Sequence, residues 1–175
     1  MNQTQLGAPV RVRRAGPADA EELTALLAGL SATSSFHRFL AGLRMPNPTL
    51  VRGLLRDEPD RGALLSVQRE PAGERALGHA CWSVTAAGAA DIGVVVADAA
   101  QGRGIGTALF LEAVDAARRA GAEAIHLDVH PENRRLLAAL RRRLGRSAFA
   151  WEQGLVRAEL PVTALPLPAD LVAAA

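Results

Sequence analysis

Residues Ile92–Ala108 read I-G-V-V-V-A-D-A-A-Q-G-R-G-I-G-T-A, and this segment sets the architecture of the chain. A short valine-rich run, typical of a strand, leads directly into a glycine-rich turn and then into the pattern of an amphipathic helix. Glycines let a backbone approach a ligand closely, and the first N–H groups of a helix have no partner within it. A strand, turn and helix in this order bind phosphates, so we expect a cofactor that carries a diphosphate.

Two common phosphate-binding patterns fit this segment poorly. The phosphate loop of nucleoside triphosphatases requires G-K-[ST], and the chain contains no lysine. The dinucleotide fingerprint G-x-G-x-x-G belongs to a first βα unit, with an acidic residue about 20 residues further on. Here the glycines are spaced G-x-G-x-G, at Gly102, Gly104 and Gly106, and they lie past mid-chain. A turn whose glycines only allow tight packing is the alternative without a ligand.

The pattern Q-x-x-G-x-G, formed by Gln101, Gly104 and Gly106, resembles the pyrophosphate-binding loop of the GCN5-related N-acetyltransferases (GNAT). The resemblance implies acetyl-CoA as the cosubstrate. It also implies a single-domain α/β (α+β) fold, in which a mixed, mostly antiparallel sheet is flanked by helices on both faces. The expected domain is 10–160, with terminal extensions at 1–9 and 161–175.

The same resemblance implies a set of cofactor-binding residues. In the family, the strand before the turn separates from its neighbour and pairs with the pantetheine arm, and an asparagine after the next strand reaches that arm. The matching residues are Val94, Val95, Val96, Gln101, Gly102, Arg103, Gly104, Ile105, Gly106, Thr107 and Asn133. Ordinary structural roles are open as well, because valines suit a buried strand and Asn133 is a good N-cap residue. No metal is expected.

Acetyl transfer to an amine requires a neutral nitrogen. At pH 7, removing the proton costs about 4.6 kcal/mol for a lysine of pKa about 10.4 and about 1.4 kcal/mol for an α-amine of pKa near 8. A lysine acetyltransferase therefore gains more from a general base. The lysine-acetylating branch of the family has a glutamate where this chain has Asp91, so we predict that a partly buried Asp91 is the base, acting directly or through a water. The alternatives are His79, Asp128 and His130.

The segment Leu30–Leu40, L-S-A-T-S-S-F-H-R-F-L, resembles the L-S-x-x-S-x-Y-x-R-F-F helix of the bacterial protein lysine acetyltransferases. This resemblance implies that the acceptor is a lysine side chain of a protein. Plainer roles are open for these residues, with Phe36 and Phe39 in the core and Arg38 in a structural ion pair. The glycine turn does not specify the acceptor, so a small-molecule amine is an alternative.

One departure from the family concerns the acid that protonates the leaving thiolate. Many members have a tyrosine in a Y-x-x-x-G pattern, whereas this chain has Arg141 before Gly145 and no tyrosine anywhere. A thiol with a pKa near 8.5 can leave as the anion, so activity does not require the acid. The departure nevertheless keeps a further alternative open, a sensor that binds acyl-CoA without catalysis.

The composition excludes several classes of protein. The net charge is +2, aromatic residues make up only 3% of the 175 residues, and binding to nucleic acid is therefore not expected. No apolar run approaches the roughly 18 residues that span a membrane. The lone Cys81 is expected to be a buried filling residue in a reducing compartment, and Met1–Pro9 lacks a signal pattern, so we expect a cytoplasmic protein. The resemblance to the bacterial lysine acetyltransferases implies a bacterial one. The oligomeric state stays open.

Hydrophobic periodicity predicts the remaining elements. The predicted strands are Val10–Arg14, Ala63–Arg69, Ala76–Thr85, Asp91–Val96, Ala124–Val129, Ala148–Trp151 and Leu155–Leu160. The predicted helices are one that starts at Pro17, then Ser34–Leu43, Leu50–Arg56, Thr107–Ala120 and one from Asn133 through Leu144. The first hairpin is expected around Pro71-Ala72-Gly73, and the tail Pro161–Ala175 is expected over the surface.

Overall fold

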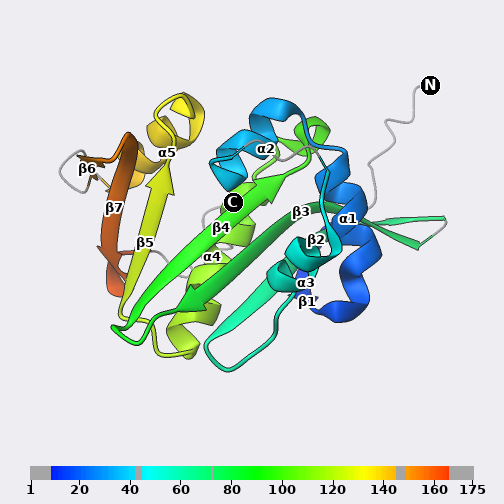
Figure 1. Cartoon of the computed structure of the whole chain (residues 1–175), viewed down its shortest axis with the longest axis horizontal. Coiled ribbons are helices and arrows are strands. Elements are labelled where there is room, and N and C mark those ends of the chain that lie inside the picture. The colour runs from blue at the N-terminus through cyan, green and yellow to red at the C-terminus, as the bar shows by residue number, and fades with distance from the viewer. Residues whose placement is uncertain (1–8, 42–44, 72, 145–148, 166–175) are drawn as a thin grey trace, which may run out of the picture.

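The computed structural model describes residues 9–41, 45–71, 73–144 and 149–165, and Figure 1 shows how its elements are arranged. Within these residues the strands are β1 Val10–Ala15, β2 Arg61–Glu70, β3 Gly73–Val84, β4 Ala89–Val96, β5 Ala124–Val129, β6 Phe149–Glu152 and β7 Leu155–Pro161. The α-helices are α1 Ala20–Ala28, α2 Ala32–Phe39, α3 Pro48–Leu54, α4 Ile105–Arg119 and α5 Arg134–Leu144. All seven strands belong to one sheet, in the order β1-β2-β3-β4-β5-β7-β6.

The sheet separates two hydrophobic cores, which explains why both faces of its central strands are apolar. On one face Leu64 and Trp82 pack with α4, and on the other Leu65 and Val67 pack with α1 and α3. Successive side chains of a strand point to opposite faces, so the neighbours Leu64 and Leu65 belong to different cores. The predicted fold, a mixed and mostly antiparallel sheet with helices on both faces, is confirmed.

β4 and β5 form the one parallel pair among the described strands, and they separate soon after they meet. Their ladder joins 89–91 to 124–126 and then ends, and Figure 1 shows the two strands diverging. On its other side β4 stays paired with β3 as far as Val96. The edge of β4 that faces β5 therefore has no strand partner from residue 92 onward, as the resemblance implied.

Most predicted elements are present with shifted ends. The hairpin of β2 and β3 is longer than predicted, because its backbone pairing continues through polar residues as far as Glu70 and Gly73. α4 begins before Thr107, at Ile105, and it ends before Gly121, whose φ of +93° is the left-handed conformation of a C-terminal cap. None of the described helices is both long and apolar enough to cross a membrane.

The C-terminal tail differs from its prediction at its start. Val162 and Leu165 are buried in the core beside α4, because the tail opens with apolar side chains that cover this cluster. The expected extension 1–9 is described only at Pro9, and the expected extension 161–175 only as far as Leu165. Ala72 of the predicted hairpin turn and Gly145 of the predicted Y-x-x-x-G position also lie outside the described residues.

Candidate active site

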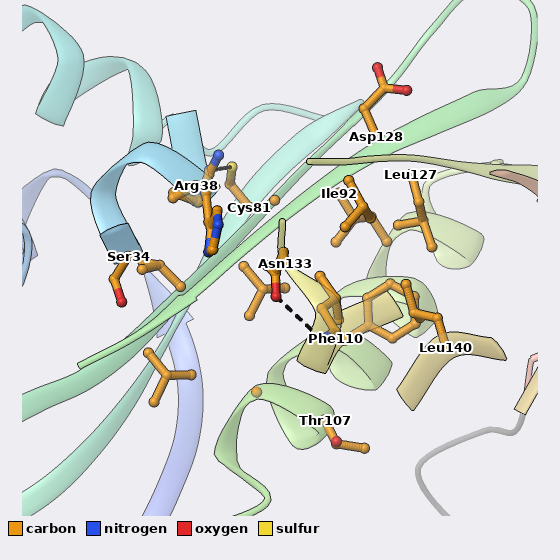
Figure 2. Close-up of a pocket in the computed structure, with 18 of the residues that line it drawn as sticks. Ser34, Arg38, Cys81, Ile92, Thr107, Phe110, Leu127, Asp128, Asn133 and Leu140 are labelled. Atoms are coloured by element: carbon orange, nitrogen blue, oxygen red, sulfur yellow. Dashed lines mark hydrogen bonds between the residues drawn. The ribbon is translucent and has the colours of Figure 1, made fainter. Parts of the chain in front are cut away.

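A cleft of about 1130 Å³ opens where β4 leaves β5. We call one side the turn wall: it consists of Ile92, Val94 and Val96 of β4, most of the turn 101–107 and the inward faces of α4 and α5. Two predicted cofactor residues of the turn, Arg103 and Ile105, do not line the cleft, and Ile105 is buried in the core. We call the other side the α2 wall: it consists of α2, the part of β3 that lines the cleft, and the opposite face of β4 and β5. Figure 2 shows residues of both walls around the cleft.

The turn wall begins as a cradle of backbone N–H groups. Gly102 and Gly104 have φ values of +83° and +80°, a conformation that favours glycine, and Gly104 is the N-cap of α4. A Cβ on Gly106 would lie 3.4 Å from Val96 Cγ2, so the helix start lies close against β4. The N–H groups of residues 102–107 find no acceptor among the described residues. Unpaired N–H groups at the positive end of a 15-residue helix suit a diphosphate.

Beyond the cradle the turn wall is apolar. Ile92, Phe110, Leu127 and Leu140 line it from four different elements (Figure 2). Such a surface, beside the free edge of β4, suits a long aliphatic arm that carries amide groups able to pair with the strand. The backbone of Val94, Val95 and Val96 belongs to this edge.

Asn133 directly precedes α5, on the side of the turn wall. Its Oδ1 accepts a hydrogen bond from the Leu136 N–H at 3.2 Å, so its predicted role as N-cap is confirmed. The side-chain amide group lines the cleft and donates to no described residue. It remains available to a ligand, and its predicted contact with a cofactor remains a prediction.

A polar network ties α2 to the turn. The Asp98 carboxylate accepts hydrogen bonds from the Ser31 N–H at 2.9 Å and from the hydroxyls of Ser31 and Ser34 at 2.7 Å each. Gln101 Nε2 donates to Ser34 Oγ at 3.1 Å and to the Val96 carbonyl at 3.2 Å. Desolvation raises the pKa of Asp98, but the hydrogen bonds from Ser31 and Ser34 outweigh it and leave that pKa below its ordinary value.

The sequence prediction gave Gln101 a role but missed Ser31, Ser34 and Asp98. The serine spacing S-x-x-S at the start of a helix was the available signal, because Ser31 caps α2 by accepting the Ser34 N–H at 3.2 Å. Nothing in the sequence indicated that the cap faces Asp98, which is 67 residues further along the chain.

Arg38 lies on the α2 wall without the ion pair expected for it. Within the described residues no carboxylate lies within 4.0 Å of its guanidinium, and its Nε is buried with no hydrogen-bond partner. The guanidinium packs over Gly93, where a Cβ would lie 2.5 Å from its Cζ, and it donates to Cys81 Sγ at 3.2 Å. Cys81 is half-buried and lines the cleft, so it is not the buried filler that was expected.

Asp91 also lies on the α2 wall, at the last paired position before β4 and β5 separate. It is exposed, so the predicted partial burial is wrong: β4 and β5 part directly after this pair, and no helix covers the side chain. The carboxylate has no hydrogen-bond or ion-pair partner among the described residues. It is therefore open to contact by a molecule that enters the cleft, and its predicted role as the base stays a prediction.

The alternative bases are engaged elsewhere. His79 is fully buried, and its Nε2 lies 3.3 Å from the Leu54 carbonyl, which only accepts, so Nε2 carries the hydrogen. Burial, with the nearby charge of Arg38, lowers the pKa of His79 to about 3. Asp128 accepts two hydrogen bonds from Arg157, at 2.8 and 3.1 Å. His130 follows the end of β5 and packs on Phe36 of α2, with ring centroids 5.0 Å apart.

Arg141 points away from the cleft. It is exposed on the far side of α5, beside Leu137 and Trp151, and it does not line the turn wall. The residues of α5 that do line the cleft are Arg134, Arg135, Leu136, Ala139 and Leu140, together with the N-cap Asn133. Arginine stays protonated at physiological pH, so the described part of α5 brings no side chain that would replace the tyrosine acid.

The comparisons with known proteins agree with this geometry. The sequence model of the acetyltransferase (GNAT) family matches residues 34–145, more than half of the chain. No curated protein matches the sequence. The GNAT domain of S. lividans PAT is 24% identical, with a TM-score of 0.73 over 87% of this chain and 90% of that one.

Two further solved structures are similar in fold. A GCN5-related N-acetyltransferase from Kribbella flavida is 25% identical, with a TM-score of 0.66 over 87% of this chain and 97% of that one. The putative acetyltransferase yncA from Salmonella typhimurium, solved with its cofactor acetyl-CoA, is 18% identical with a TM-score of 0.66, over 87% and 94% of the two chains.

Proposed function

Because the chain belongs to the acetyltransferase (GNAT) family and is an acetyl-CoA-dependent N-acetyltransferase, we propose that its acceptor is the side-chain amine of a protein lysine. The observation that carries this proposal is the exposed and unpartnered carboxylate of Asp91 in the wall of an open cleft. Lysine is the amine that most needs such a group, since its ammonium is the hardest to deprotonate at neutral pH. The likeness of Leu30–Leu40 to the lysine-acetylating branch supports the same acceptor.

Acetyl-CoA supplies the acetyl group as a thioester, whose carbonyl carbon accepts a neutral amine nitrogen. In this proposal the N–H groups of the turn 102–107 hold the diphosphate, and the free edge of β4 at Val94–Val96 orients the arm. A backbone N–H of β4 polarises the carbonyl oxygen. Asp91 takes the proton from the lysine ammonium, directly or through one water. The new C–N bond replaces the C–S bond, and the nitrogen gives its second proton to solvent as the amide forms. The thiolate leaves and takes a proton from solvent.

Mass spectrometry of peptides incubated with isotopically labelled acetyl-CoA tests the acceptor. One set carries a single lysine and a blocked N-terminus, and a matched set carries a free N-terminus and no lysine. The proposal predicts labelled acetyl-lysine in the first set and little label in the second. The enzyme itself contains no lysine, so it contributes no acetyl-lysine background. Acetylation of small amines, with no acetyl-lysine in any peptide or protein, would refute the lysine acceptor.

Arg38 favours a second candidate, a small amine that also carries an anionic group. Its guanidinium lies on the α2 wall, and among the described residues no carboxylate lies within 4.0 Å of it. The guanidinium is therefore a suitable partner for a carboxylate or phosphate of the acceptor. Comparing amino acids with their decarboxylated analogues tests this candidate. A preference for the amino acids that Arg38→Gln abolishes would establish it, and equal rates would eliminate it.

A further inference from the structure

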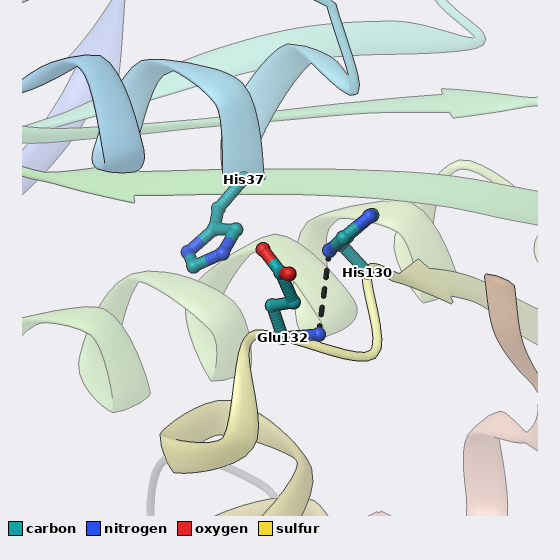
Figure 3. Close-up of side chains that lie close together, drawn as sticks. All are labelled: His37, His130 and Glu132. Atoms are coloured by element: carbon teal, nitrogen blue, oxygen red, sulfur yellow. Dashed lines mark hydrogen bonds between the residues drawn. The ribbon is translucent and has the colours of Figure 1, made fainter.

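Three side chains of types that can ligate a metal converge beside the cleft, and only His130 of the three was considered above, as a possible base. They are His37 of α2 and His130 and Glu132 of the loop between β5 and α5, and Figure 3 shows them facing one another. Each offers one ligand atom, and these atoms lie within 4.8 Å of one another. His37 and Glu132 also line the cleft, so solvent reaches the cluster. Two elements that are distant in sequence thus present a His, His, Glu set at one point.

The two histidine rings are held in place by their neighbours. Their centroids lie 6.1 Å apart with an interplanar angle of 27°, and Phe36 packs edge-on against His130 at 5.0 Å. The Nδ1 of His130 accepts the backbone N–H of Glu132 at 3.3 Å, so this nitrogen carries a lone pair rather than a hydrogen. A contact of this length is weak and is readily given up for a stronger bond.

The three candidate ligand groups do not interact with one another. Among the described residues no hydrogen bond or ion pair joins His37, His130 and the Glu132 carboxylate. Two of the three groups, the Nδ1 of His130 and the carboxylate, are acceptors, and their lone pairs are what a metal cation takes as ligands. In a tetrahedral zinc site with bonds of about 2.1 Å, neighbouring ligand atoms lie about 3.4 Å apart. The side chains would therefore close by little more than about 1 Å.

We propose that His37, His130 and Glu132 bind a divalent transition-metal ion of the zinc type, which joins α2 to the loop between β5 and α5 across the mouth of the cleft. Imidazole nitrogen and carboxylate oxygen are ligands that zinc, cobalt and nickel accept. Three protein ligands leave the fourth position of a tetrahedral ion to water. The ion cross-links the two sides of the entrance, so it stabilises the folded chain by mass action.

Cobalt(II) titration of the untagged, chelator-treated protein tests the site, because tetrahedral cobalt absorbs visible light. Coenzyme A is left out, since its thiol binds metals. We expect one equivalent of cobalt to bind per chain with visible absorption, zinc to displace it, and saturating zinc to raise the melting temperature. His37→Ala and Glu132→Gln should each weaken binding at least about tenfold.

The matched control is His126→Ala, which removes another half-exposed histidine, one that pairs with Glu159 at 3.2 Å outside the cluster. It should bind cobalt like the wild type, and so should Cys81→Ser, which removes the only thiol. Glu132 is exposed, so Glu132→Gln leaves the core intact and keeps the test valid if His37→Ala folds poorly. No cobalt absorption, or unchanged affinity in Glu132→Gln, would overturn the proposal.

Discussion

The two walls of the cleft are built from different chemistry. The turn wall presents backbone groups: the N–H groups of residues 102–107 and the free edge of β4. The α2 wall presents side chains, among them Arg38, Asp91 and His37, from elements far apart in sequence. A backbone site needs only a local order of glycines and a helix, whereas a side-chain site needs a tertiary arrangement. The turn wall therefore fits the cofactor class, and in our proposal the α2 wall decides what is acetylated.

If the α2 wall supplies the base, removing that base should slow the chemical step, and this is the largest effect we expect. Asp91→Asn should lower kcat for a lysine peptide by about 100- to 1000-fold, with little change in KM for acetyl-CoA. The defect should shrink as the pH rises from 7 to 9, because the lysine then loses its proton without help. Release of free thiol measures both constants. Asp128→Asn is the control, since Asp128 is held by Arg157, and its kcat should stay near that of the wild type. An unchanged kcat in Asp91→Asn would eliminate Asp91 as the base.

The turn wall should respond through binding instead. Gly104→Asp should raise KM for acetyl-CoA about 100-fold, because the carboxylate occupies the free N–H groups and repels the diphosphate. Aspartate tolerates left-handed φ and is a good N-cap, so the melting temperature should change little. Gly154→Asp is the matched control at a φ of +82° in the turn between β6 and β7, outside the cleft. Equal KM values in the two variants would show that the cradle does not hold the cofactor.

His79 lies beneath the α2 wall and makes the stability of that side depend on pH. Its pKa is about 3 when folded and about 6.5 when unfolded, so below pH 6.5 the unfolded chain binds a proton that the folded chain does not. Stability is therefore lost as the pH falls, by about 2 kcal/mol between pH 7.5 and 5.0. Urea unfolding at the two pH values measures it. His79→Gln keeps a donor for Leu54 and should lose this part of the pH dependence. An equal slope in both proteins would contradict the assignment.

The smallest expected effect concerns the polar network that ties α2 to the turn. Asp98→Asn weakens the bonds from Ser31 and Ser34 and should cost about 1 kcal/mol, a modest value because the network is exposed. The pKa of Asp98 is lowered in the folded chain, so this contribution is present at neutral pH and is lost as the pH falls below about 4. Thermal melts at pH 7 measure the cost, and Asp57→Asn, an exposed partner of Arg14, is the control. If KM for acetyl-CoA also rises, α2 helps to position the turn.

The turn wall could be predicted from the sequence far better than the α2 wall. The strand, the glycine turn and α4 were predicted to within two residues, because propensity, left-handed glycines and helix caps act over short distances. The exposure of Asp91, the engagement of Asp128 by Arg157 and the burial of His79 were not predicted. Each depends on which strand or helix lies opposite, and hydrophobic periodicity gives the face of a strand but not the neighbour.

The close approach of Arg38 to Gly93 couples the two positions. A Cβ at position 93 would lie 2.5 Å from the Cζ of Arg38, so the guanidinium would have to move to make room for it. The guanidinium is the far end of a flexible side chain, so a substitution at position 93 displaces the cation from the strand instead of breaking the fold. A glycine at position 93 therefore does more than permit the strand, because it sets where this positive charge rests.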